Sequence, residues 1–102
     1  MELISILLGA WVVSVQLTEA DLSQANLNSS NLSNACLQRA KLKDTNLTRA
    51  NLTKTTLFGV DLSRTDLTDI SLSGAVCDLA TQWPEDFDWE WAGVYCLGPN
   101  QS

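Results

Sequence analysis

Leucine returns at every fifth position through the middle of this chain. It occupies position i of twelve consecutive five-residue units, from Leu17 to Leu72, and Cys77 takes the next place. Position i−2 holds a small or β-branched residue in every unit, and polar residues fill most of the other positions. Five is neither the period of an α-helix nor that of a β-strand, so the pattern needs another explanation.

Neither regular element would gather these leucines on one face. A helix turns about 100° per residue, so successive leucines would lie about 140° apart around its axis. A straight strand alternates its side chains between two faces, so a spacing of five would reverse each successive leucine. Within one unit, however, positions i−2 and i lie on the same side of a short extended piece. The pattern therefore predicts a chain that turns a corner once per unit and winds around a leucine-filled interior.

The charged residues predict how many sides this coil has. Residues one coil apart are cross-strand neighbours, where opposite charges stabilise the pair and like charges destabilise it. An offset of 20 residues brings together only opposite charges, whereas offsets of 15 and 25 also bring together like charges. Four sides are therefore expected; in a triangular β-helix, the runner-up, Asp21 would neighbour Cys36 instead of Lys41. The opposite pairs at the offset of 20 are Glu19–Arg39, Asp21–Lys41, Lys41–Asp61, Asp44–Arg64 and Arg49–Asp69.

The repeated unit, a small residue, Asp or Asn, Leu, Ser or Thr and then any residue, resembles the pentapeptide-repeat family. It is carried by "EADLS", "QANLN", "SSNLS", "RANLT", "GVDLS" and "RTDLT", and the resemblance covers roughly residues 15–78. The later segment "ATQWPEDFDWEWAG" is similar to a C-terminal segment that follows such repeats in cyanobacterial members. The resemblance implies an all-β fold, a right-handed four-sided (quadrilateral) parallel β-helix.

Three parts of the chain are expected. Residues 1–14 would form an apolar N-terminal cap or partial first coil, residues 15–79 the repeat β-helix, and residues 80–102 an aromatic, acidic C-terminal cap and tail. Caps are needed because a coil exposes its leucine interior at both ends. The sequence predicts a short helix at Pro84, which acidic residues follow. The predicted plug of the last coil consists of Trp83, Phe87, Trp89 and Trp91.

Residues 3–17 carry no charge, and this leaves three interpretations open: a first coil or cap, a signal or membrane anchor, and a dimer contact. The stretch is shorter than the roughly 20 apolar residues of a membrane helix. A secretory signal has a positively charged start, whereas this chain begins with Glu2 and has no early Lys or Arg. We therefore expect a cytoplasmic protein, with an exported or membrane-anchored protein as the alternative.

The composition argues against catalysis. The chain of 102 residues has no His and no Gly-rich phosphate loop. Imidazole-based acid–base chemistry is therefore excluded, and no enzyme activity, cofactor or metal site is expected. Cys36, Cys77 and Cys96 are widely spaced and form no C-x-x-C motif, so they are expected to be plain thiols in a reducing compartment.

The net charge of −6 lies mainly in the tail, because residues 15–78 hold seven acids and six bases. The absence of a basic stripe disfavours nucleic-acid binding. Some pentapeptide-repeat proteins imitate DNA and inhibit type II topoisomerases, and this alternative matches the nearly neutral repeats poorly. We expect a non-catalytic structural or protein–protein interaction module with an unknown protein partner, with self-association through an end or through the side of Phe58 as a further possibility.

Phe58 is the only aromatic residue within the repeats, and it occupies an outward i+1 position. An exposed aromatic side chain beside apolar neighbours indicates a contact site. The alternative is that the C-terminal tail or the N-terminal segment covers this side of the coil. The candidate protein contacts are Phe58, its side-mates Cys36, Thr56 and Val76, and the tail residues Trp89 and Trp91.

Overall fold

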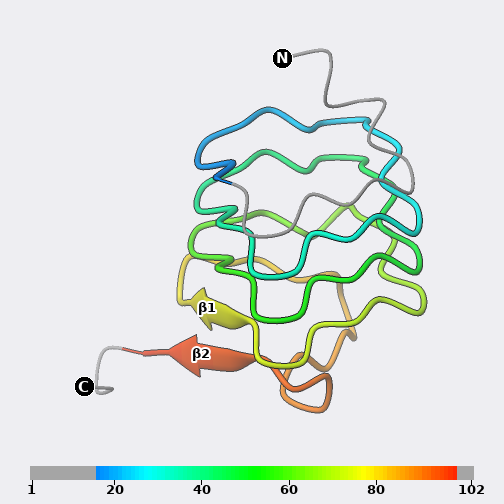
Figure 1. Cartoon of the computed structure of the whole chain (residues 1–102). Coiled ribbons are helices and arrows are strands. Elements are labelled where there is room, and N and C mark those ends of the chain that lie inside the picture. The colour runs from blue at the N-terminus through cyan, green and yellow to red at the C-terminus, as the bar shows by residue number, and fades with distance from the viewer. Residues whose placement is uncertain (1–15, 99–102) are drawn as a thin grey trace.

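The structure, a computed structural model, describes residues 16–98 as a stack of four-sided coils (Figure 1). Parallel β-bridges join residues that lie 20 apart along the repeats, as in Gln16↔Cys36 and Asn26↔Asn46. Each coil therefore consists of four five-residue sides, one extended piece per side. Asp21 pairs with Lys41 and not with Cys36. The four-sided prediction is thereby confirmed, and the triangular alternative is wrong.

Only two pieces of the described chain are long enough to be strands. These are β1 (Val76–Asp78) and β2 (Tyr95–Leu97), which pair in parallel at the C-terminal end of the stack (Figure 1). Their register places Val76 opposite Tyr95, Cys77 opposite Cys96 and Asp78 opposite Leu97. In the repeats above them, the chain turns two residues after each bridge. The extended pieces are therefore too short to count as strands, and each forms a single β-bridge.

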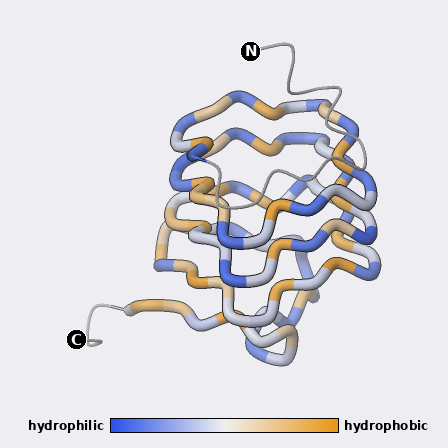
Figure 2. Tube along the Cα trace, in the orientation of Figure 1, coloured by the Kyte–Doolittle hydropathy of each residue, from blue (hydrophilic) through white to orange (hydrophobic). Residues whose placement is uncertain are grey.

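Leucine side chains fill the interior of the stack. Those from Leu22 to Leu62 are at most 1% exposed, whereas Leu17 and Leu67, nearer the two ends, are each 9% exposed. Most of the small residues at position i−2 are buried beside them, and hydrophobic and hydrophilic residues alternate along each coil in Figure 2. Buried hydroxyl groups at i−2 are satisfied locally: Ser30 Oγ donates to the carbonyl of Leu27 at 2.7 Å, and Thr55 Oγ1 to that of Leu52 at 2.8 Å.

Each corner is closed by a backbone hydrogen bond and, where position i−1 is Asn or Asp, also by a side-chain hydrogen bond. The backbone N–H that begins one unit donates to the leucine carbonyl of the unit before, as Ala20 N does to Leu17 O at 3.0 Å. The Asn or Asp at i−1 accepts bonds from the residue at i+1: Asn46 Oδ1 accepts from the N–H and the hydroxyl of Thr48 at 3.0 and 2.8 Å. The expectation that these Asn and Asp side chains bond the nearby backbone is confirmed, and it explains the Ser or Thr at i+1.

Three of these corner carboxylates should make stability depend on pH. The N–H of Ser23 lowers the pKa of Asp21 below its ordinary 3.8, and the hydroxyls of Ser63 and Thr68 lower the pKa of Asp61 and of Asp66. A carboxylate whose pKa is depressed by folding stabilises the protein above its unfolded pKa, and this contribution is lost as the pH falls through the folded pKa. We expect the free energy of unfolding, measured with urea, to be level down to about pH 5 and to fall below about pH 4.

Asparagine provides the matched control for this prediction, because it already occupies equivalent corners and keeps the accepting Oδ1. The triple variant Asp21→Asn, Asp61→Asn and Asp66→Asn should show a smaller loss of stability between pH 5 and pH 3 than the parent. A loss as steep in the triple variant as in the parent would show that these three corners do not contribute to the acid sensitivity.

The last coil departs from the spacing of 20. Asp61 pairs with Gln82, 21 residues away, and Val76 with Tyr95, 19 residues away. The predicted helix at Pro84 is wrong, because residues 80–98 contain turns and β2 but no helix. Phe87 N donates to Pro84 O at 3.1 Å, which closes one turn, and the left-handed backbone of Asp86 (φ 69°) ends it there.

Cys77 and Cys96 form a disulfide, so the expectation that all three cysteines are plain thiols is wrong for these two. They are register partners on β1 and β2, with their Cα atoms 4.4 Å apart. Sequence spacing did not suggest this pair, because only the shortened last coil places Cys96 directly beside Cys77. Cys36 is a half-buried free thiol, as expected.

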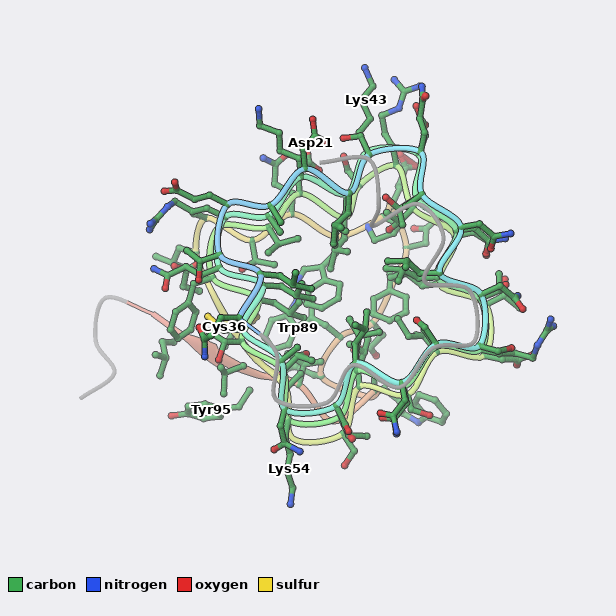
Figure 3. All side chains as sticks on the ribbon, turned by 45° about the horizontal axis from the view of Figure 1, so that its top comes forward. Asp21, Cys36, Lys43, Lys54, Trp89 and Tyr95 are labelled. Carbon is green, nitrogen blue, oxygen red and sulfur yellow. A yellow bond between two sulfur atoms is a disulfide. The ribbon has the colours of Figure 1, made fainter. Side chains whose placement is uncertain are left out.

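Aromatic side chains close the C-terminal end of the interior. Trp83 and Phe87 stack with their ring centroids 5.3 Å apart, and both pack against the core together with Trp89. Figure 3, which looks along the coil, shows Trp89 beneath its interior. The predicted plug is therefore confirmed for three of its four residues and wrong for Trp91, which is 87% exposed.

Residues 1–15 and 99–102 fall outside the described residues, and so do the interpretations proposed for residues 1–14. Across residues 16–98, no helix has the length and apolar character needed to cross a membrane.

Candidate functional site

One side of the coil carries an outward column of apolar residues. Cys36 bridges to Thr56 and Thr56 to Val76, so these predicted contact residues lie one above another. Tyr95 continues the column as the register partner of Val76. Cys36 and Tyr95 project from the same side of the coil in Figure 3. We call this surface the apolar side; it comprises Cys36, Thr56, Phe58, Val76, Leu79, Tyr95 and Leu97.

Phe58 lies in the neighbouring outward column of the apolar side, between Gln38 in the coil above and Asp78 in the coil below. It is half-buried, whereas the equivalent outward residues Lys43 and Ser63 on the next side are exposed. β2 extends this column with Leu97, the register partner of Asp78. The described part of the C-terminal tail therefore extends the apolar side by one further extended piece, β2, below β1. This arrangement differs from the alternative in which the tail folds across Phe58.

Three exposed apolar residues of this side were missed from the sequence. Leu79 is 74% exposed, Tyr95 is 55% exposed and Leu97 is 40% exposed. Two signals were available for finding them. Leu79 falls outside the five-residue register of the buried leucines, and Tyr95 and Leu97 alternate with the buried Val94 and the half-buried Cys96, as expected for an extended strand.

Cys36 is the one free thiol among the described residues. Its Sγ lies 3.4 Å from Thr18 Oγ1, and the hydrogen bond with Thr18 lowers the pKa of the Cys36 thiol. The apolar side to which it belongs offers exposed apolar surface that a contact can bury.

Trp89 and Trp91 do not belong to this side. Both lie in the segment that follows the last regular coil; Trp89 is packed beneath the interior and Trp91 projects into solvent. The six predicted contact residues therefore fall into two places, four of them on the apolar side and two at the C-terminal end.

The charged pairs on the coil surface are only partly engaged. Within residues 16–98, Arg39 Nη2 lies 2.9 Å from Glu19 Oε2, and Arg64 Nε lies 3.5 Å from Asp44 Oδ1. Arg49 instead donates to Asn28 Oδ1 at 3.2 Å and so points away from Asp69. Exposed pairs of this kind contribute at most about 1 kcal/mol each, so they influence the choice of register more than the total stability.

The parallel bridges at a spacing of 20, with one buried leucine per side, define a solenoid protein of the four-sided β-helix class. The chain belongs to the pentapeptide-repeat family: the family model for pentapeptide repeats matches residues 14–44 and 35–74, in eight copies. The right-handed quadrilateral β-helix implied by the repeat unit is the fold of this family. A comparison with curated proteins finds no match.

Two solved structures show the same fold. The crystal structure of alr5209, a pentapeptide repeat protein from Nostoc Pcc 7120, is 26% identical, with a TM-score of 0.52 over 86% of this chain and 81% of that protein. A pentapeptide repeat protein from the thylakoid lumen of Arabidopsis thaliana is 21% identical, with a TM-score of 0.51 over 89% of this chain. This chain spans 64% of the length of the Arabidopsis protein.

Proposed function

We propose that this protein is a non-catalytic protein–protein interaction module and that the apolar side is its contact surface. The observation that carries the proposal is the run of exposed apolar residues there, with Leu79 74%, Tyr95 55% and Leu97 40% exposed. The outward positions of the other sides hold mainly Asn, Asp, Ser, Thr, Lys and Arg. An apolar surface rimmed by polar residues is typical of a protein contact site.

The DNA-mimic alternative has less support than an interaction module. Acids and bases lie side by side on the described coils, as in the pairs Arg39–Glu19 and Arg64–Asp44, so no continuous negative stripe runs along the repeats. A surface that imitates DNA would need closely spaced negative charge along its whole length.

The substitution Phe58→Ser tests the apolar side. If a partner or a second copy contacts this side, the variant should lose self-association or partner binding while its free energy of unfolding changes by less than about 1 kcal/mol. Sedimentation at several concentrations measures self-association, and denaturant unfolding measures stability. Lys43→Ser is the matched control, because Lys43 occupies the same i+1 position on the next side.

Two results would contradict this assignment. A large loss of stability in Phe58→Ser without any change in association would mean that the chain itself covers Phe58. Unchanged stability, association and partner binding would make Phe58 an ordinary surface residue and leave the proposed contact surface without support.

A further inference from the structure

The last coil lacks a rung on one of its four sides. On the other three sides the chain pairs with the coil above through Leu62 N to Gln82 O at 2.7 Å, Gly74 N to Gly93 O at 3.0 Å and the β1–β2 pair. On the side formed by residues 65–69, the chain leaves the stack and passes through turns over residues 84–92, the orange loop at the bottom of Figure 1. Three sides of the last coil are therefore paired and the fourth is left as an open edge.

Backbone groups along this edge have no hydrogen-bond partner within residues 16–98. The N–H groups of Leu67 and Asp69 donate to no acceptor there, and the carbonyl of Thr65 accepts from no donor. One coil above, the same side is paired: Arg49 N, above Asp69, donates to Thr68 O at 2.9 Å, and Asn46 bridges to Asp66. Two coils above, Leu27 N donates to Asn46 O at 2.9 Å, and Ala25 O accepts from Asn46 N at 3.0 Å. Unpaired strand edges of this kind are templates for a further strand.

Two adjoining hollows open between this edge and the loop. They have volumes of about 510 and 370 Å³ and share Leu67, Asp86 and Phe87 in their walls. One extends along Thr65–Thr68 toward Pro84, and the other passes Asp69 and Ile70 toward Trp91 and Ala92. We call the combined surface the edge groove. It lies on the side of the coil opposite the apolar side.

The edge groove combines an apolar floor with a negative rim. Leu67, Ile70 and Phe87 supply apolar surface, and the exposed Trp91 stands at one end. No Lys or Arg lines either hollow, and Arg49, the base above Asp69, is engaged with Asn28 instead. The acids that line the two hollows are Asp66, Asp69, Glu85, Asp86 and Asp88.

We propose that the edge groove binds a short, extended, basic segment of another protein, which completes the missing rung. This proposal rests on the proposed function as an interaction module and adds a second surface to it. The backbone of the segment would pair with Leu67 N–H, Asp69 N–H and Thr65 C=O. Backbone pairing supplies affinity in this mode of recognition, and alternate side chains supply specificity. Apolar side chains on one face of the segment meet Leu67 and Phe87, and Lys or Arg on the other face meet the carboxylates and the face of Trp91.

An octapeptide of alternating Lys and Val, labelled with fluorescein, is the first probe. Its binding to the full chain, measured by fluorescence anisotropy at low salt, should be at least tenfold tighter than that of the matching Glu and Val peptide. Added salt should weaken it, because exposed charges are screened. Hydrogen exchange of the Leu67 and Asp69 amides should slow at least tenfold in the complex. The Arg39 amide, already bonded to Phe58 O at 2.8 Å, should not change.

The double variant Asp69→Asn and Asp86→Asn tests the negative rim. Both residues have left-handed backbones (φ 57° and 69°), which asparagine adopts readily, so the substitution removes charge and leaves the fold intact. The Lys and Val peptide should bind this variant at least fivefold more weakly. Asp44→Asn is the matched control, since Asp44 has φ 59° and lies outside the groove. It should bind like the parent.

Several results would overturn the edge groove as this site. These are equal binding of the two peptides, binding without slower exchange at Leu67 and Asp69, and equal effects of the double variant and Asp44→Asn. Protection of the same two amides without peptide, lost on dilution of the protein, would assign the edge to a second copy of the chain and also overturn the proposal. None of these results would affect the apolar side, which is tested separately through Phe58.

Discussion

Replacing Leu52 with alanine should lower the free energy of unfolding by about 2–5 kcal/mol. Leu52 is fully buried in the middle of the stack, in one column with the buried Leu32 above it and Leu72 below it. The residues at position i−2 are small, so they cannot fill the space that the substitution opens. Denaturant unfolding followed by tryptophan fluorescence measures the loss.

Leu79→Ala is the control for this experiment, because Leu79 is 74% exposed and lies outside the buried columns. It should change the free energy of unfolding by no more than about 0.5 kcal/mol. Similar losses in the two variants would contradict the leucine-filled interior, since burial would then make no difference.

Breaking the Cys77–Cys96 disulfide should cost about 2–4 kcal/mol. The bond closes a loop with a sequence separation of 19, and this loop contains Trp83, Phe87 and Trp89 of the aromatic plug. Without the bond, the unfolded chain gains conformational freedom, and β2 loses its covalent link to β1. Unfolding of the parent with and without a reducing agent measures the effect.

The double variant Cys77→Ala and Cys96→Ala should match the reduced parent to within the small cost of losing two buried sulfur atoms, and reductant should not destabilise it further. Cys36→Ala, which removes the free thiol, should keep the full response to reductant. A parent protein that is equally stable in oxidising and reducing conditions would show that the disulfide does not hold the C-terminal end.

The coil itself could be predicted because the same residue pattern recurs in every five-residue unit. One leucine and one small or β-branched residue per unit determine where the chain points inward, and Asn or Asp in many of the units indicates where it turns. The opposite charges of Asp21 and Lys41 then indicated the spacing between coils, and their bridge has that spacing. The apolar side follows from the same period, which placed Cys36, Thr56 and Val76 in one column.

The last coil could not be predicted, because it breaks this period. Its pairs at 21 and 19 residues have no counterpart in the repeats, so the five-residue period does not place Cys96 beside Cys77 or β2 beside β1. The open edge at Leu67 and Asp69 could not be predicted for the same reason. This edge exists because the chain leaves the stack over residues 84–92. The five-residue repeat ends before this segment, so it does not predict the path of the chain there.

The side chains at the left-handed corners can vary without affecting the residues that stabilise the coil. Glu19, Gln24, Arg39 and Lys54 all have φ between 58° and 64°, although they differ in charge and length. The hydrogen bond that closes the corner at Glu19, Ala20 N to Leu17 O, uses backbone atoms alone. A corner residue can therefore change its charge while the leucine columns stay as they are. Such a scaffold can acquire a new partner by substitution at its corners, with its interior left unaltered.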